Sequence, residues 1–162
     1  TNLTEILHSI PWFLGLNQKQ LEQLASISAL IEHQPGDVIF SEGDRAVNMY
    51  IILAGEVGID VSIPTRGLIR TYVAEPLDII GWSKMTPVVR QRVASTIALC
   101  DVTLLEIKGD QLLALCDEDH LVGYIVFRRI ANVVATNLLT TKLQLMEMIL
   151  QPSQELPPNT MA

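Results

Sequence analysis

The sequence predicts a mainly β fold with flanking helices, an antiparallel barrel or roll that is followed by a long C-terminal helix. Between residues 29 and 108, short β-branched runs alternate with turn sequences, and no helical crossover separates them. Strands at this density are expected to pair antiparallel. Apolar residues recur at helical spacing before and after this region. At 162 residues, the chain fits one domain with a substantial core.

Residues 1–28 are predicted to form two short amphipathic helices that belong to the β domain. The first follows Leu3, Ile6 and Leu7, and the second has apolar residues at Leu21, Leu24, Ala25 and Ile27. An elbow containing proline and glycine, residues 10–16, separates them.

Residues 29–108 carry the predicted strands and the turns that join them. Glycine-containing turns recur at residues 35–37, 42–44 and 55–56. Glu42 and Asp44, which flank Gly43, are interpreted as turn residues rather than as a catalytic carboxylate pair. The predicted strands are Val38–Phe40, Met49–Leu53, Val57–Ile63, Ile69–Val73, Val93–Ala98 and Val102–Ile107.

Residues 109–150 are predicted to be helical, with a disordered tail over residues 151–162 that contains three prolines. Apolar residues spaced alternately by three and four favour a parallel coiled coil and therefore a homodimer. The alternative is that this face packs on its own domain, although Ile125, Ile130 and Val133 offer a separate stripe for that role. The predicted dimer face, which begins one turn earlier at Tyr124, contains Phe127, Ala131, Val134, Leu138, Thr141, Leu145 and Met148.

Composition excludes several classes of function. Eighteen acidic residues against eleven basic ones give a net charge of -7, which disfavours direct binding to nucleic acid. No apolar run reaches the length of a membrane span. Cys100 and Cys116 lack metal-site spacing and are interpreted as reduced core thiols of a cytoplasmic protein. The three histidines are scattered, and no nucleophile or P-loop motif occurs, so neither a metal site nor an enzyme is predicted.

The segment 78–94, DIIGWSKMTPVVRQRVA, is the most informative candidate site. An apolar strand ends at Gly81, a short polar turn follows, and Arg90 and Arg92 open another apolar run. Glycine permits close approach of the backbone, and the start of a short helix leaves amides unpaired. The segment therefore predicts a site for an anion, with phosphate as the first candidate.

Four motifs carry a resemblance that extends over residues 3–150. In order they are PGDVIFSEGD, MYIILAGEVGI, DIIGW and an Arg-x-Ala before a strand, and a long helix follows. This order resembles the cyclic-nucleotide-binding domain of the catabolite activator and fumarate-nitrate regulator superfamily. The resemblance implies a double-stranded antiparallel β-roll, with Gly36, Gly43 and Gly55 at its turns, and a C-terminal dimerisation helix.

The resemblance also implies a phosphate-binding cassette over residues 78–94. Gly81 matches the family glycine, Ser83 falls in the amide-rich turn, and Arg92 matches the arginine that holds the phosphate. Val93 and Ala94 follow that arginine as in the family pattern. Asn137 is expected where the long helix meets the base of the ligand.

Three residues leave alternatives open. Trp82 stands where the family has the glutamate that takes the ribose 2′-hydroxyl, so the indole either stacks on a ligand or fills the pocket. Arg90 replaces Arg92 as the matching arginine if the cassette is compared with superfamily members that carry a GWS sequence. Arg92 itself either clamps a phosphate or is a solvated charge paired with Asp101 or Glu106.

The sequence thus favours a non-enzymatic, dimeric regulatory module that binds a small phosphate-bearing effector. Cyclic AMP and cyclic GMP are the first candidates, and the response is expected to pass through the dimer helix or an unidentified protein partner. One alternative is a ligand-free interaction or scaffold domain with a degenerate pocket. The other is the effector half of a transcription regulator, with a DNA-binding domain after Ala162.

Overall fold

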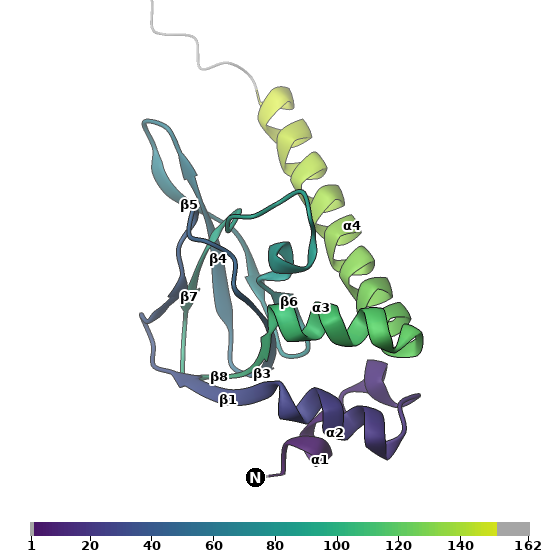
Figure 1. The fold of residues 1–162 in the computed structure, drawn as a ribbon. Coiled ribbons are helices and arrows are strands. Elements are labelled where there is room, and N and C mark those ends of the chain that lie inside the picture. The colour runs from purple at the N-terminus through teal and green to yellow at the C-terminus, as the bar shows by residue number, and fades with distance from the viewer. Residues whose placement is uncertain (1, 152–162) are drawn as a thin grey trace, which may run out of the picture.

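The computed structural model describes residues 2–151, which form a roll of two facing antiparallel sheets with helices along one side (Figure 1). The predicted fold class, mainly β with a long C-terminal helix, is confirmed. Most of the predicted disordered tail, residues 152–162, lies outside the described residues.

Each sheet contains four strands. In the first sheet the order is β1-β8-β3-β6, and in the second it is β2-β7-β4-β5. All six strand pairings are antiparallel. The strands are β1 (Ser28–His33), β2 (Val38–Phe40), β3 (Asn48–Ala54), β4 (Val57–Ile63), β5 (Gly67–Ala74), β6 (Ile79–Ile80), β7 (Ser95–Ala98) and β8 (Val102–Lys108).

β3, β5 and β8 extend one or two residues beyond their predicted bounds, and larger differences from the prediction occur at two places. β1 was not predicted as a separate strand, because it is a half-exposed edge whose burial does not alternate regularly. The strand predicted to begin at Val93 begins at Ser95 instead. The backbone of Arg92 bonds to the turn at Gly43 and Asp44, so the chain joins the ladder only after that turn.

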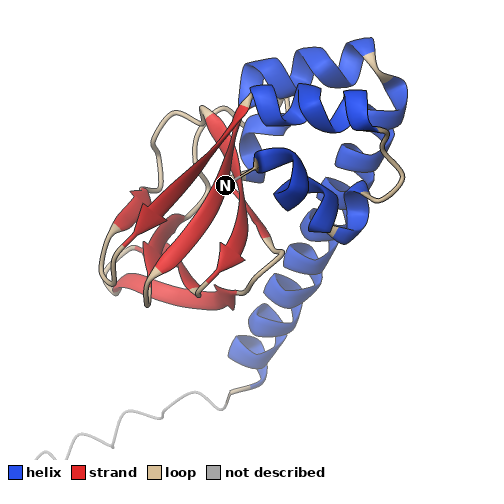
Figure 2. Cartoon of the chain, turned by 90° about the horizontal axis from the view of Figure 1, so that it is seen from below, coloured by secondary structure: helices blue, strands red, loops and turns tan. Residues whose placement is uncertain are grey.

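The helices gather on one side of the roll (Figure 2). Asn17 and Gln20 form a capping box at the start of the second helix. The predicted helical block is divided at Asp119, whose carboxylate accepts hydrogen bonds from the amides of Leu121 and Val122. The helices are α1 (Leu3–Ser9), α2 (Gln18–Ser26), α3 (Gly109–Glu118) and α4 (His120–Leu150), with short 3₁₀ turns at Pro11–Phe13 and Trp82–Met85.

Two hydrophobic cores hold these layers together. The inter-sheet core lies inside the roll and includes Ile52 and Leu104 from one sheet and Val57 from the other. The helix-side core joins the outer face of the first sheet to all four α-helices and includes Ile51 and Val126. Ile130 is buried in this second core, and Ile125 and Val133 pack against it. The stripe of Ile125, Ile130 and Val133 therefore packs against its own domain, the role predicted for it from the sequence.

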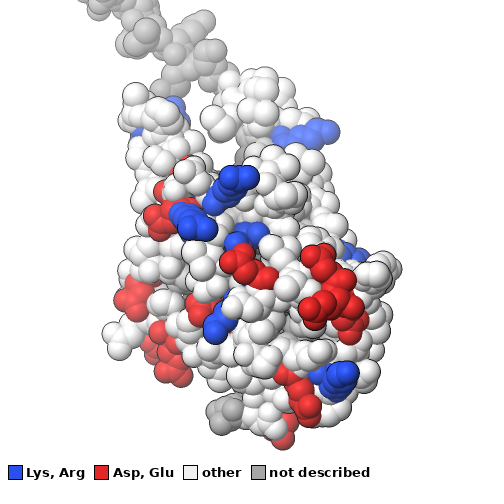
Figure 3. All heavy atoms as spheres, in the orientation of Figure 1, with Lys and Arg blue, Asp and Glu red and all other residues white. Residues whose placement is uncertain are grey.

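Acidic and basic side chains are interspersed on the face shown in Figure 3, where the described basic residues form no continuous stripe. Among residues 2–151, none of the helices combines the length and apolar character that crossing a bilayer would require.

The reactivity of the Cys116 thiol tests how deeply this side chain is buried in the fold. Both cysteines are free thiols, and burial, assisted by the charges of Asp117 and Asp119, raises the pKa of Cys116 from 9.0 to about 11. This difference of two pH units lowers the thiolate fraction by about 100-fold at neutral pH. We expect Cys116 to react with a disulfide reagent at pH 8 far more slowly than a solvated thiol.

The measurement uses the Cys100→Ala variant, in which Cys116 is the remaining thiol. The reaction of this variant is compared in folded and urea-unfolded protein. Because the folded thiol keeps its proton longer than the unfolded one, its contribution to stability is complete below pH 9 and is lost as the pH rises towards 11. Equal rates in the two states would contradict the burial of this thiol.

Candidate functional site

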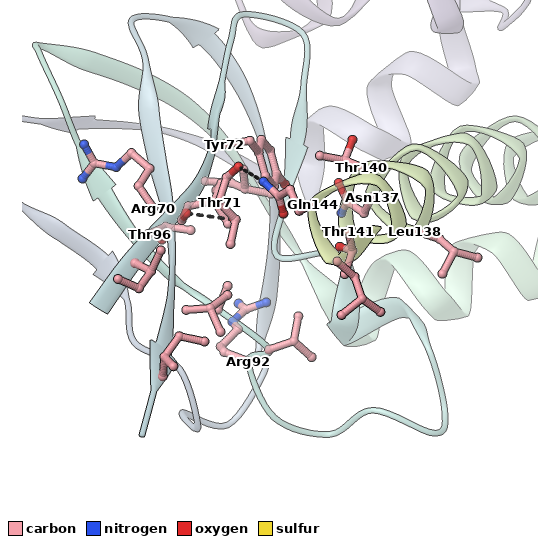
Figure 4. A pocket seen from close by; sticks show the side chains of 18 of the residues that line it. Arg70, Thr71, Tyr72, Arg92, Thr96, Asn137, Leu138, Thr140, Thr141 and Gln144 are labelled. Carbon is pink, nitrogen blue, oxygen red and sulfur yellow. Dashed lines mark hydrogen bonds between the residues drawn. The ribbon is translucent and has the colours of Figure 1, made fainter. Parts of the chain in front are cut away.

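A cavity of about 870 Å³ lies between the second sheet and the C-terminal half of α4. Figure 4 shows Arg92 on the roll side of this space and Asn137, Leu138 and Thr141 on the helix side. The 3₁₀ turn after Gly81 and the segment that follows Arg92 complete the wall. Most of the predicted cassette is therefore brought to one cavity.

Arg92 is the buried cation of the site, with 4% of its surface exposed. Its Nη1 donates a hydrogen bond to the carbonyl of Gly81 at 2.9 Å, and its Nη2 donates to the carbonyl of Asn48 at 2.6 Å. The guanidinium also lies 4.2 Å from the centre of the Phe40 ring. These contacts fix the guanidinium in the cavity wall.

No carboxylate in the described residues pairs with Arg92, and the expected alternative partners, Asp101 and Glu106, form no ion pair with it. Burial lowers the pKa of Arg92, against the opposing influence of Tyr50 and Asp44. A cation that is removed from water without a counterion is unfavourable. A bound anion would supply the missing charge.

Both the backbone conformation and the close contacts at position 81 require a glycine. Its φ of +73° lies in the left-handed region. A Cβ at this position would meet Arg92 Nη1 at 2.7 Å and the carbonyl oxygen of Asn48 at 3.1 Å. Ser83, which is 2% exposed, follows in the 3₁₀ turn and lines the cavity. The glycine thus lets the turn pass directly over the guanidinium.

The turn at residues 42–44 positions the backbone of Arg92. The Arg92 amide donates to the carbonyl of Asp44 at 2.7 Å, and the Arg92 carbonyl accepts from the Gly43 amide at 2.9 Å. Glu42 in turn accepts a hydrogen bond from the amide of Ser62 at 2.8 Å. The interpretation of Glu42 and Asp44 as turn residues agrees with this arrangement. Their support of Arg92 was not predicted, because it joins distant segments.

The two candidate arginines lie in different environments. Arg90 is exposed and is not part of the cavity wall, whereas Arg92 is buried in it. Of the residues after Arg92, Ala94 is buried, Val93 is 47% exposed, and both line the cavity.

Trp82 is half-buried and packs against the helix-side core. It forms part of the cavity wall, and the cavity keeps its volume of about 870 Å³ beside the indole. Trp82 therefore does not fill the pocket.

Asn137 lies in the wall, as predicted from the resemblance, and its side chain interacts with the hydroxyl of Tyr72. Burial raises the pKa of Tyr72, and this interaction opposes the shift. One heptad later, Gln144 Nε2 donates to the carbonyl of Thr71 on β5 at 2.8 Å, as Figure 4 shows. This link was missed, although two amides seven residues apart on one helix face were a possible signal.

The predicted dimer face overlaps the cavity. Five of its members, those from Val134 to Met148, line the cavity, whereas Phe127 and Ala131 do not. Phe127 is 40% exposed. A second exposed set with heptad spacing lies on the same helix and consists of Leu139, Leu143, Met146 and Leu150.

Asn48 connects the site to the C-terminal helices. Its carbonyl accepts from Arg92, and its side-chain Oδ1 accepts from the amide of Gly109 at 3.4 Å. Gly109 is the first residue of α3.

Comparisons with known proteins agree with this geometry. The sequence profile of the cyclic nucleotide-binding domain matches residues 30–119, while a search of curated protein sequences found no match. A candidate cyclic nucleotide-binding protein from Geobacter metallireducens is similar in structure, with a TM-score of 0.72 and 25% identity over 85% of this chain and 99% of that one.

Two further structures show the same fold in larger regulators. The catabolite activator protein of Thermus thermophilus has a TM-score of 0.67 and 23% identity, over 85% of this chain and 62% of its own. The regulatory subunit of a cAMP-independent protein kinase A from Trypanosoma brucei has a TM-score of 0.68 and 21% identity, over 86% of this chain and 49% of its own.

Proposed function

The chain belongs to the cyclic nucleotide-binding domain family, and from this premise we propose that it is a regulatory sensor that binds a small anionic effector in the cavity that Gly81 and Arg92 line. The observation that carries the proposal is the buried guanidinium of Arg92, which lines a cavity and has no carboxylate partner among residues 2–151. The sequence resemblance to regulators of this superfamily is confirmed.

A phosphate-bearing effector suits this site because a guanidinium can bind two phosphate oxygens at once. Cyclic AMP and cyclic GMP are the first candidates. Trp82 supplies no carboxylate for the ribose hydroxyl, and the loss of one charge-assisted hydrogen bond is worth roughly 1.5 to 3 kcal/mol, or about ten- to a hundredfold in affinity. One structural relative is itself described as cAMP-independent, so the fold alone does not define the ligand.

The response is proposed to pass through α4. This helix supplies part of the cavity wall and also carries the exposed residues of the predicted dimer face. An effector that binds one helix position more tightly shifts the population towards it, by no more than its differential affinity. The module would then act through its dimer or a protein partner, without catalysing a reaction.

Isothermal titration of the purified chain with cyclic AMP, cyclic GMP and inorganic phosphate tests the proposal. We expect saturable binding of at least one of these ligands and a higher melting temperature in its presence. The absence of both effects for all three ligands at millimolar concentration would contradict the binding of a cyclic nucleotide or free phosphate at this site.

The dimer is tested at Phe127, which belongs to the predicted face and lies outside the cavity wall. A buried, unpaired carboxylate is strongly unfavourable, so Phe127→Glu is expected to weaken a dimer by at least tenfold in analytical ultracentrifugation. Leu139→Glu is the matched control, because Leu139 is 57% exposed on the other heptad set. If only Leu139→Glu produces monomers, the partner contacts the other set.

A second candidate is the effector half of a transcription regulator. The sensor domain of the transcriptional regulator DNR from Pseudomonas aeruginosa matches 83% of this chain and 90% of its own, with 18% identity and a TM-score of 0.69. Sequencing the gene beyond the codon for Ala162 tests this candidate, and a basic helix-turn-helix region after it would support a DNA-directed output.

A further inference from the structure

The cavity is larger than an anion needs. Its volume of about 870 Å³ lies near the upper end of the range of roughly 300–1,000 Å³ for ligand pockets. On α4 the wall runs from Val134 to Met148, which is about 21 Å at a rise of 1.5 Å per residue. Most of this length lies beyond the buried guanidinium of Arg92, so the ligand has room for a substantial body.

The walls available to this body are mainly apolar, although Arg66 and Arg70 also line the cavity, and Arg70 is paired with Asp60 at 2.9 Å. Ile59, Val61 and Ile63 alternate along β4 and line the cavity on one side. Leu138, Leu145 and Met148 line it from α4. Leu138 and Met148 are 69% and 67% exposed, so a ligand that covered them would remove apolar surface from water.

Several polar groups of the wall already have partners. Gln144 donates to the Thr71 carbonyl, and the Thr96 hydroxyl accepts from the Phe40 amide. Asn137 interacts with Tyr72. Of the described residues that line the cavity, Glu147 is the only carboxylate, and it lies in the last turn of α4 rather than beside Gly81.

This distribution of charge and apolar surface points to one chemical class. Resting on the proposed function, we propose that the effector is an amphipathic anion with a phosphate or carboxylate head at Arg92. Its alkyl or aryl body lies along the apolar wall between β4 and α4. A ribonucleotide is the poorer fit, because most of its hydroxyls and ring donors would lie against apolar side chains, with Ser83, Thr140 and Thr141 among the polar exceptions in the wall.

Titration with a graded series of ligands tests the assignment. Butyl phosphate and octyl phosphate vary the body, inorganic phosphate lacks it, and octan-1-ol lacks the charged head. Each buried methylene is expected to strengthen binding about fourfold, so octyl phosphate should bind up to roughly 200-fold more tightly than butyl phosphate. Octanoate, run in parallel, distinguishes a carboxylate from a phosphate head.

Ile63→Gln places a polar amide in the apolar wall at a side chain that is 40% exposed. This change should weaken the binding of octyl phosphate at least tenfold and leave the affinity for inorganic phosphate unchanged. Val88→Gln is the matched control, because Val88 is 89% exposed in a loop outside the wall. Equal affinity of wild type and Ile63→Gln for octyl phosphate would overturn the location of the body.

The remaining outcomes separate this assignment from the proposed function. If cyclic AMP or cyclic GMP binds more tightly than octyl phosphate and this binding requires Arg92, the assignment of an amphipathic ligand is wrong and the sensor proposal stands. If octan-1-ol binds as tightly as octyl phosphate, the assignment of a charged head to the ligand is wrong. If no anion of either kind binds, both proposals fail.

Discussion

Replacing Arg92 by glutamine is expected to abolish measurable anion binding and to lower the free energy of unfolding by about 2–4 kcal/mol. The change removes the donors to the carbonyls of Gly81 and Asn48 and the stacking of the guanidinium on Phe40. A hydrogen bond to a charged group contributes about 1.5–3 kcal/mol. Relief of a buried charge offsets part of this loss.

Two variants make the Arg92 experiment specific. Arg92→Lys keeps the charge but loses the planar fork, so its affinity is expected to lie between wild type and Arg92→Gln. Arg90→Gln changes an exposed arginine and should alter stability by no more than about 0.5 kcal/mol. Urea unfolding gives stability, and titration at a temperature where circular dichroism shows folded protein gives affinity. Loss of binding in Arg90→Gln alone would transfer the role to that arginine.

Replacing Gly55 by alanine is expected to lower the free energy of unfolding by at least about 3 kcal/mol. Gly55 has a φ of +88° in the turn between β3 and β4. A Cβ there would collide with the carbonyl oxygen of Asp101 and lie 2.9 Å from Val102 Cγ2. Val102 is 2% exposed in the inter-sheet core, so neither neighbour can move away without disturbing β8.

Gly36→Ala separates the collision from the backbone strain. Gly36 has a φ of +89°, and a Cβ there would have no atom within 4 Å. Its replacement should therefore cost only about 1–2 kcal/mol, the strain of the left-handed conformation. The difference between the two variants in urea unfolding measures the collision alone. Equal losses would mean that the 101–102 backbone yields at little cost.

The sequence predicted the features of the fold that are set locally. The turns at Gly36, Gly43 and Gly55 were recognisable because each needs a positive φ, which glycine adopts without a Cβ clash. β-branched runs between those turns located β2 and β4 at their observed bounds.

The site could be predicted only as a set of residues. The bonds from Arg92 to Asn48 and from Gln144 to Thr71 join positions 44 and 73 residues apart, and no local pattern encodes such distances. Heptad spacing on α4 identified an apolar face, but periodicity does not say what covers it. Leu138 and Leu145 thus appear in the cavity wall as well as on the predicted dimer face.

The backbone and side-chain oxygens of Asn48 connect the guanidinium of Arg92 to the C-terminal helices. One oxygen holds Arg92 and the other meets the first amide of α3. An anion that draws the guanidinium towards itself would compete with the bond to the Asn48 carbonyl, and a shift of this residue would also alter the contact of its side chain with the Gly109 amide. Asn48, the first residue of β3, therefore links an occupied cavity to the start of α3.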